Sequence, residues 1–173
     1  VFVVVNKTGA HFPYAQMLPP AQRTGARITD YRAAVQRNAV AWLARLQAGL
    51  DAHTLAFYTS DHGQDFRRKA PHCNTGTDVS PQEYAVPFLV LGGSPAQLAR
   101  LRAASGAYRD RLSHLKVSES VRNALGYRFD FADSVFRPPQ RLGLAPCGIH
   151  GPPKPFFGMG PRCRPLHPSA SQS

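Results

Sequence analysis

The stretch TLAFYTSDHG (Thr54–Gly63) decides the fold that we expect for this chain. Its apolar run, residues 54–59, predicts a buried β-strand. Asp61 and His62 follow, so two metal-ligand side chain types stand next to each other at the C-terminal tip of that strand. Ligands of open α/β sheets bind at this edge. The stretch therefore predicts a sheet and a candidate site together.

The segment before this stretch completes a unit with it. Residues 1–6 form a β-branched apolar run, which predicts a strand covered on both faces. Apolar residues then recur in steps of three and four from Ile28 to Leu50, and this pattern predicts a long helix capped by Thr29 or Asp30. Strand, helix and strand in this order are typical of a βαβ unit. We expect an α/β fold with a mostly parallel sheet flanked by helices.

The rest of the chain predicts three more elements and a tail. A strand is expected over 86–91, a short helix from Ser94 to Gly106, and a second helix over 112–125. From Phe136 onward the chain is rich in Pro, Gly and Arg, contains no acidic residue and shows no apolar period. We expect one domain over 1–135 and an irregular, disordered basic tail over 136–173.

The composition argues against several classes of protein. The net charge of +11 suggests nucleic-acid binding, but the arginines are scattered and no recognition motif accompanies them, so nucleic acid is not the expected partner. Three cysteines, Cys73, Cys147 and Cys163, are too few and too far apart for a disulfide framework or a paired-cysteine zinc site. No apolar stretch approaches the about 20 residues that cross a bilayer.

Four residues are candidates for chemistry. A carboxylate beside an imidazole suits zinc or manganese, so Asp61 and His62 are candidate metal ligands; the alternative is a helix cap beside a surface histidine. His11 follows the first strand and would share the edge of a parallel sheet with Asp61, unless it is an ordinary loop histidine. His72 lies in a loop that could fold back over the site. No motif marks a nucleophile.

Taken together, these segments resemble the second half of the sulfatase-type domain of the alkaline phosphatase superfamily. The nearest match is to the phosphoethanolamine transferases that modify lipid A and related bacterial envelope glycans. The similar segments follow the family's order: VVNKTGAHFPY at 4–14, the helix at 31–46, YTSDHGQ at 58–64, His72 with SPQEYAVP at 80–87, and the closing segment at 113–126. The resemblance covers residues 1–130.

The resemblance implies roles for the four candidates. Asp61 and His62 would hold Zn²⁺, with Mn²⁺ or Ca²⁺ as other options, while His11 and His72 would contact the phosphoryl group or a second ion. The reaction implied is transfer of phosphoethanolamine from a phospholipid to an envelope glycolipid, at the periplasmic face of the bacterial inner membrane. By the same resemblance, the family's threonine nucleophile and first acidic ligand would lie upstream of Val1. We therefore expect an incomplete and inactive chain, whose membrane contact belongs to the missing N-terminal part.

Three positions depart from the family's pattern. Gln64 stands where Glu is usual, Asn6 where an earlier histidine often sits, and Cys73 where glycine is usual. Two other readings stay open. One is a sulfatase, whose nucleophile would be a modified Cys or Ser. The other is a basic binding remnant that keeps the fold without the chemistry.

Overall fold

The computed structural model describes residues 1–72, 80–108, 114–127 and 134–136. The chain divides into two compact units, Val1–Asp51 and Ala52–Ser173. Except for Phe136, the predicted tail lies outside the described residues. In the described part of the chain, no helix combines the length and the apolar character needed to span a bilayer.

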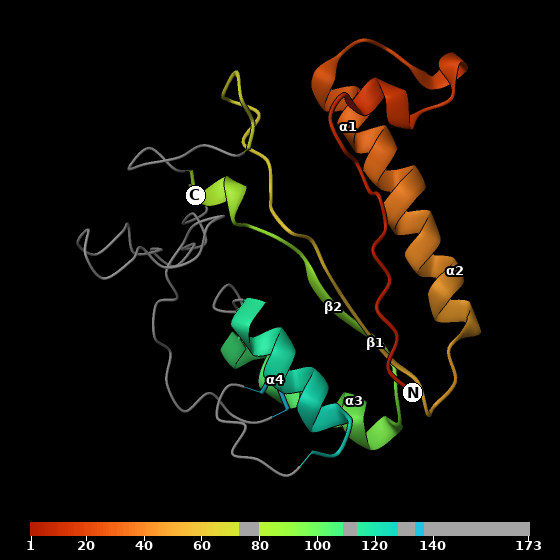
Figure 1. The fold of residues 1–173 in the computed structure, drawn as a ribbon, viewed down its shortest axis with the longest axis vertical. Helices are drawn as coiled ribbons and strands as arrows, with labels where there is room; N and C mark the ends of the chain where they lie inside the picture. The colour runs from red at the N-terminus through yellow and green to blue at the C-terminus, as the bar shows by residue number, and fades with distance from the viewer. Residues whose placement is uncertain (73–79, 109–113, 128–133, 137–173) are drawn as a thin grey trace, which may run out of the picture. The chain divides into compact units, whose positions relative to one another are not determined.

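A single long helix dominates the first unit, as the apolar spacing predicts. It runs without a break through α1 (Arg27–Val35), the π-helical turn η3 (Gln36–Val40) and α2 (Ala41–Gly49) (Figure 1). Two short 3-10 turns precede it, η1 (Tyr14–Met17) and η2 (Pro20–Gln22). The turn η1 packs against α1. The unit is therefore a helix with its preceding loop folded against it.

The core of this unit is small and lies between η1 and α1. Tyr14, Leu18 and Ala34 are buried, and the ring of Tyr14 meets that of Tyr31 edge to face with centroids 5.1 Å apart. Such aromatic pairs add stability beyond the apolar area they bury. Ala34, in α1, is fully buried.

Asp30 secures the start of the helix from inside its first turn. The residue before α1, Ala26, makes no side-chain capping bond. Instead the buried carboxylate of Asp30 accepts hydrogen bonds from the backbone N–H and the hydroxyl of Thr24, both at 2.8 Å, and from the N–H of Gly25 at 3.1 Å. Of the two predicted caps, Asp30 is the residue that holds the helix start.

These bonds predict an acid-sensitive contribution to stability. The hydrogen bonds from Thr24 lower the pKa of the Asp30 carboxyl below its ordinary 3.8. A carboxyl whose pKa is lower in the folded chain stabilises that chain above the unfolded pKa and loses this contribution as the pH falls through the folded pKa. We expect Asp30→Asn to lower the melting temperature at pH 7 more than at pH 3. An equal loss at both pH values would contradict this account of Asp30.

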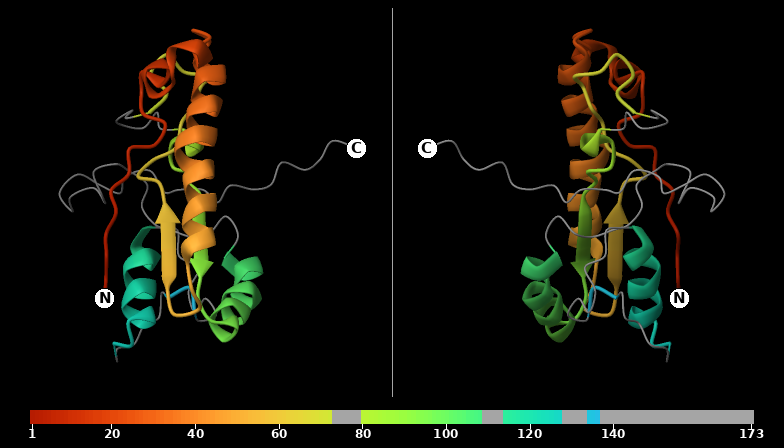
Figure 2. Two further views of the ribbon diagram at one scale, coloured as in Figure 1. Left: turned by 90° about the vertical axis from the view of Figure 1, so that its right-hand side faces the viewer. Right: turned by 90° about the vertical axis from the view of Figure 1, so that its left-hand side faces the viewer.

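The second unit contains the strands and the remaining helices. The strands are β1 (Leu55–Thr59) and β2 (Phe88–Gly92), and the helices are η4 (Pro81–Glu83), α3 (Pro95–Tyr108) and α4 (His114–Ala124). Helix α4 contacts β1, and the side views place α3 on the other side of the strand pair (Figure 2). The structure thus confirms the strands and helices predicted in this part of the chain.

The predicted pairing of the strands is wrong. The described sheet has two strands, and β1 pairs antiparallel with β2 in a register that places Leu55 opposite Gly92 and Thr59 opposite Phe88. The prediction assumed that strand, helix and strand form a parallel pair. The partner of β1 is instead the next strand along the chain, as is common for consecutive strands. The fold is a small mixed α/β arrangement, and the expected mostly parallel sheet is not the architecture of the described residues.

The run that was expected to be the first strand has no regular secondary structure. Residues 1–9 form neither helix nor strand, and Val1–Val5 are each at least 60% exposed. A continuous apolar run is compatible with a strand buried on both faces, but it supplies no backbone partner of its own. Here no such partner is present among the described residues.

Aromatic rings and one serine hold the second unit together. The ring of Phe57 lies 6.3 Å from that of Phe88 and 6.2 Å from that of Phe136. The fully buried hydroxyl of Ser120 donates to the carbonyl of Lys116 at 2.6 Å and accepts from the N–H of Val135 at 3.0 Å. Ser120 therefore ties the segment before Phe136 to α4.

Removing this hydroxyl is expected to destabilise the chain. Ser120→Ala leaves the buried N–H of Val135 without its acceptor, and an unsatisfied buried group costs about 1–3 kcal/mol. Denaturant unfolding measures the loss. Ser118→Ala is the matched control, because Ser118 is exposed on the same helix. Equal stability of the two variants would contradict the role given to Ser120.

Candidate metal site

The chain turns sharply directly after β1. The hydroxyl of Ser60 donates to the carbonyl of His62 at 2.9 Å, and the N–H of His62 donates to Oδ1 of Asp61 at 3.0 Å. The N–H of Gly63 then donates to the carbonyl of Glu83 in η4 at 2.7 Å. Short local bonds of this kind fix a loop more firmly than its lack of helix or strand suggests. The candidate ligands therefore sit on an ordered turn.

His72 folds back onto His62, as its place in the following loop suggested. The two imidazole rings are stacked, with centroids 4.5 Å apart and planes 19° from parallel. His62 is about three-quarters buried at its side chain, and His72 is half-buried. The two residues are ten positions apart in the sequence, so this contact comes from the fold of the loop. The structure thus brings together two of the four predicted site residues as a ring pair.

The hydrogen bonds of the two rings select the same tautomer. Nδ1 of His62 lies 2.9 Å from the carbonyl oxygen of Gly63, and Nδ1 of His72 lies 2.8 Å from Oε1 of Gln64. Carbonyl and amide oxygens only accept hydrogen bonds, so each Nδ1 carries the proton. In each neutral ring the lone pair is then on Nε2. Metal-binding histidines are commonly oriented in this way, by a bond from their other nitrogen.

Asp61 adds an oxygen donor beside this pair. Its side chain is 87% exposed, and Oδ2 lies 3.8 Å from Nε2 of His62. Imidazole nitrogen and carboxylate oxygen are both donors that zinc accepts. These two atoms are therefore candidate metal donors. Asp61 does not cap a helix, because the residues after it form a turn and a loop.

The donor set is partial. Zinc usually takes three or four protein ligands. Within the described ranges, no group of three or more His, Cys, Asp or Glu side chains is arranged to hold a metal ion. Asp61 and His62 supply two donors, and any further protein ligand would have to come from outside the described residues.

His11 belongs to the first unit and is exposed in the loop before η1. Its predicted place beside Asp61 rested on parallel strands, whose carboxyl ends share one edge. Since β1 is antiparallel to β2, and residues 1–9 form no strand, this argument fails. The role of His11 remains a prediction from the resemblance alone.

His114 was not among the four predicted site residues, but it reaches the end of β1 from the start of α4. Its Nε2 lies 2.7 Å from the carbonyl oxygen of Ser60 and 3.2 Å from the hydroxyl oxygen of Thr59. The carbonyl oxygen only accepts, so Nε2 carries the proton and is not a base for the hydroxyl. His114 therefore anchors α4 to the site turn, and Thr59 is not activated as a nucleophile in this geometry. The position of His114 at the start of a predicted helix was the only sign of this role in the sequence.

A buried acidic residue near the site was also missed. Asp65 lies in the polar loop after Gly63, and its carboxylate is held by Arg67, two residues later. Hydrogen bonds from Arg67 and Ser80 hold the pKa of the Asp65 carboxyl well below its usual range. Asp65 thus stays ionised although it is buried. The signal in the sequence was an acidic residue with arginines two and three positions after it.

Comparisons of this chain with protein-family models, with curated proteins and with solved structures found no match. The three cysteines, Cys73, Cys147 and Cys163, lie outside the described residues.

Proposed function

We propose that the turn after β1 is part of a divalent-metal site that serves phosphoryl-group transfer. Asp61 and His62 are the metal ligands, and zinc is the metal that suits them best. The stacking of His72 on His62, with both rings held through Nδ1, is the observation that carries the proposal. It gathers three residues with metal or phosphate chemistry on one ordered loop.

The group transferred in this proposal is phosphoethanolamine, as the resemblance implies. A bound divalent cation would neutralise charge that builds on the phosphoryl oxygens during transfer. His62 offers the Nε2 electron pair and Asp61 a carboxylate oxygen. His72, when protonated at Nε2, donates a hydrogen bond to a phosphoryl oxygen. The role of His11, which lies in the first unit, comes from the resemblance alone. The phospholipid donor, the glycolipid acceptor and the location at the bacterial inner membrane come from the resemblance alone.

Binding of the small headgroup tests this proposal. The chain is loaded with Zn²⁺ and titrated with O-phosphoethanolamine, with inorganic sulfate in a parallel titration. We expect binding of O-phosphoethanolamine that needs Zn²⁺ and is lost in His62→Ala. Preference for sulfate would overturn the transferase assignment in favour of a sulfatase. Polyanion binding with steep salt dependence, unchanged in His62→Ala and without any Zn²⁺ effect, would favour the basic remnant.

The chain by itself is expected to lack catalytic turnover. In the described site the hydroxyl of Thr59 is not activated as a nucleophile, because Nε2 of His114 carries a proton and donates a hydrogen bond to the carbonyl oxygen of Ser60. A chromogenic phosphodiester incubated with the Zn²⁺-loaded chain should release product at the background rate. Metal-dependent release that Asp61→Ala abolishes would contradict this expectation, because it would show a nucleophile within these residues.

A further inference from the structure

The loop that separates His62 from His72 is closed by two adjacent contacts. The N–H of Asp65 donates to the carbonyl of Pro71 at 2.7 Å. Next to it, Nδ1 of His72 donates to Oε1 of Gln64 at 2.8 Å. Residues 64 and 65 therefore lie against residues 71 and 72. This closure is what carries the ring of His72 back to His62.

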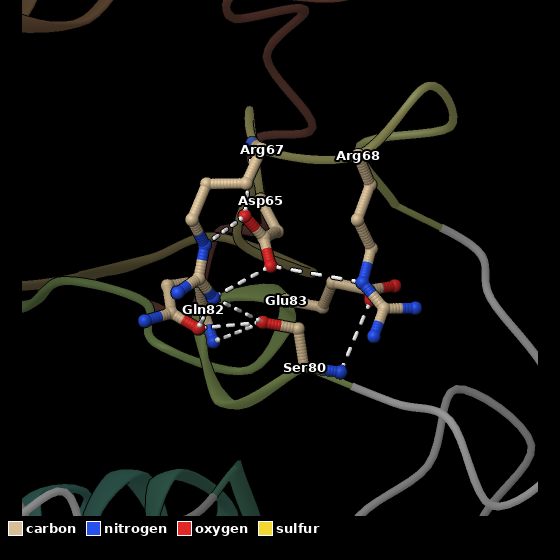
Figure 3. A network of polar contacts seen from close by, with 6 residues as sticks. All are labelled: Asp65, Arg67, Arg68, Ser80, Gln82 and Glu83. Atoms are coloured by element: carbon tan, nitrogen blue, oxygen red, sulfur yellow. Dashed lines mark hydrogen bonds and ion pairs between the residues drawn. The ribbon is translucent and has the colours of Figure 1, made fainter.

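Asp65 fastens the same loop through its side chain. Its carboxylate is 2% exposed and accepts hydrogen bonds from the backbone N–H, Nε and Nη2 of Arg67 at 3.0, 2.9 and 2.8 Å (Figure 3). Nε of Arg68 lies 3.7 Å from the same carboxylate. A bidentate bond between guanidinium and carboxylate fixes direction as well as distance. The loop is therefore held in one shape by charged groups.

Arg67 links this loop to η4. Its Nη2 donates to Oε1 of Gln82 at 2.9 Å and to the hydroxyl of Ser80 at 3.4 Å (Figure 3). The turn η4 also receives the N–H of Gly63, through the carbonyl of Glu83. Gly63 directly follows His62. The backbone next to His62 and the loop that leads to His72 are therefore both attached to η4, the first through Gly63 and the second through Arg67.

We propose that the pair Asp65–Arg67 positions the histidines of the metal site. This inference rests on the proposed function, in which His62 is a metal ligand and His72 acts beside it. Neither member of the pair is offered as a catalytic residue, because each acts through the loop that carries His72. Supporting groups of this kind typically change metal affinity 10- to 100-fold when they are removed.

Titration with Co²⁺ alone, followed by its visible absorption, tests this inference on the full chain. We expect Asp65→Asn and Arg67→Gln each to weaken Co²⁺ binding by about 10-fold or more. The double variant should bind about as weakly as either single variant, because both substitutions break one contact. Arg67→Gln tests the same contact from its other member. The side chain of Arg67 is 71% exposed, so its replacement leaves no cavity in the core.

Asp30→Asn is the matched control for a general loss of stability. Asp30 is also a buried carboxylate that holds a loop through three hydrogen bonds, but it lies in the first unit. We expect it to lower the melting temperature while leaving Co²⁺ affinity unchanged. An equal loss of Co²⁺ affinity in Asp30→Asn and Asp65→Asn would overturn the positioning role.

The outcomes separate this inference from the proposed function. Absence of Co²⁺ binding by the wild-type chain overturns both. Wild-type Co²⁺ affinity in Asp65→Asn and in Arg67→Gln, with binding still lost in His62→Ala, overturns the positioning role alone. Weaker Co²⁺ binding in both Asp65→Asn and Arg67→Gln, with unchanged Co²⁺ binding in Asp30→Asn, supports the positioning role.

Discussion

Replacing His62 by alanine is expected to abolish the stabilisation of this chain by Zn²⁺. A ligand that binds only the folded chain, present at 100 times its dissociation constant, stabilises that chain by about 2.7 kcal/mol. His62→Ala removes a nitrogen donor that is already oriented by the carbonyl of Gly63. Thermal melting with and without Zn²⁺ measures the effect. Asp61→Ala should also reduce the stabilisation of the chain by Zn²⁺.

His53→Ala is the matched control for this experiment. His53 is an exposed histidine just before β1, at the end of the strand opposite to the candidate site. Its loss should leave the Zn²⁺ effect unchanged. Equal stabilisation of the wild-type and His62→Ala chains by Zn²⁺ would show that the metal binds elsewhere, and the assignment of the site would be wrong.

Gly63→Ala is expected to have the second large effect. A Cβ at this position would meet two backbone oxygens, that of Ala85 at 2.6 Å and, closer still, that of Gln82. Backbone atoms cannot move aside as a flexible side chain can. Overpacking typically costs about 1–3 kcal/mol. Because Gly63 also bonds to Glu83, the displaced turn should carry His62 with it and weaken Zn²⁺ binding.

Gly106→Ala separates this steric effect from the general effect of adding a methyl group. Gly106 lies in α3, and a Cβ there meets nothing within 4 Å. Alanine is the better helix former by about 1 kcal/mol, so this variant should be more stable than the wild-type chain. Denaturant unfolding compares the two variants. Unchanged stability and Zn²⁺ affinity in Gly63→Ala would contradict the close packing of the turn against η4.

The long helix, the two strands of the described sheet and the helices α3 and α4 could be predicted from the sequence, because their signals are local, whereas the strand predicted at residues 1–6 is absent. Apolar spacing predicted a long helix from Ile28 to Leu50, and the observed helix runs from Arg27 to Gly49. Short apolar runs predicted the ends of β1 and β2 to within two residues. The π-helical turn in the middle of the long helix has no such signal. In a π-helical turn each backbone hydrogen bond spans one residue more than in an α-helix. This change leaves the spacing of apolar residues in the sequence almost unchanged.

The pairing of the strands could not be predicted in the same way. A run such as Leu55–Thr59 is apolar whether its neighbour is parallel or antiparallel. The order of strand, helix and strand suggested a parallel partner at residues 1–6, but the partner of β1 is β2. Because of this error, the reason for expecting His11 and Asp61 at one shared edge was also wrong.

The candidate site was predicted in part. Asp61 and His62 could be named because a carboxylate and an imidazole follow a strand directly. The contact of His72 with His62 depends on the closure of a polar loop, and polar loops have no period to interpret. Asp65, Arg67 and His114 take their importance from partners that lie 2 to 54 residues away, and only coordinates reveal such partners.

Nitrogen-15 NMR of the histidine side chains, with and without Zn²⁺, tests the central claim most directly. This spectrum reports which ring nitrogen carries the proton and which one binds metal. The account predicts that His62 and His72 are both protonated at Nδ1 in the metal-free chain. It further predicts that Zn²⁺ shifts the Nε2 signal of His62, and that this shift disappears in Asp61→Ala or at least weakens strongly. A proton on Nε2 of His62, or a Zn²⁺ shift confined to other histidines, would contradict the account.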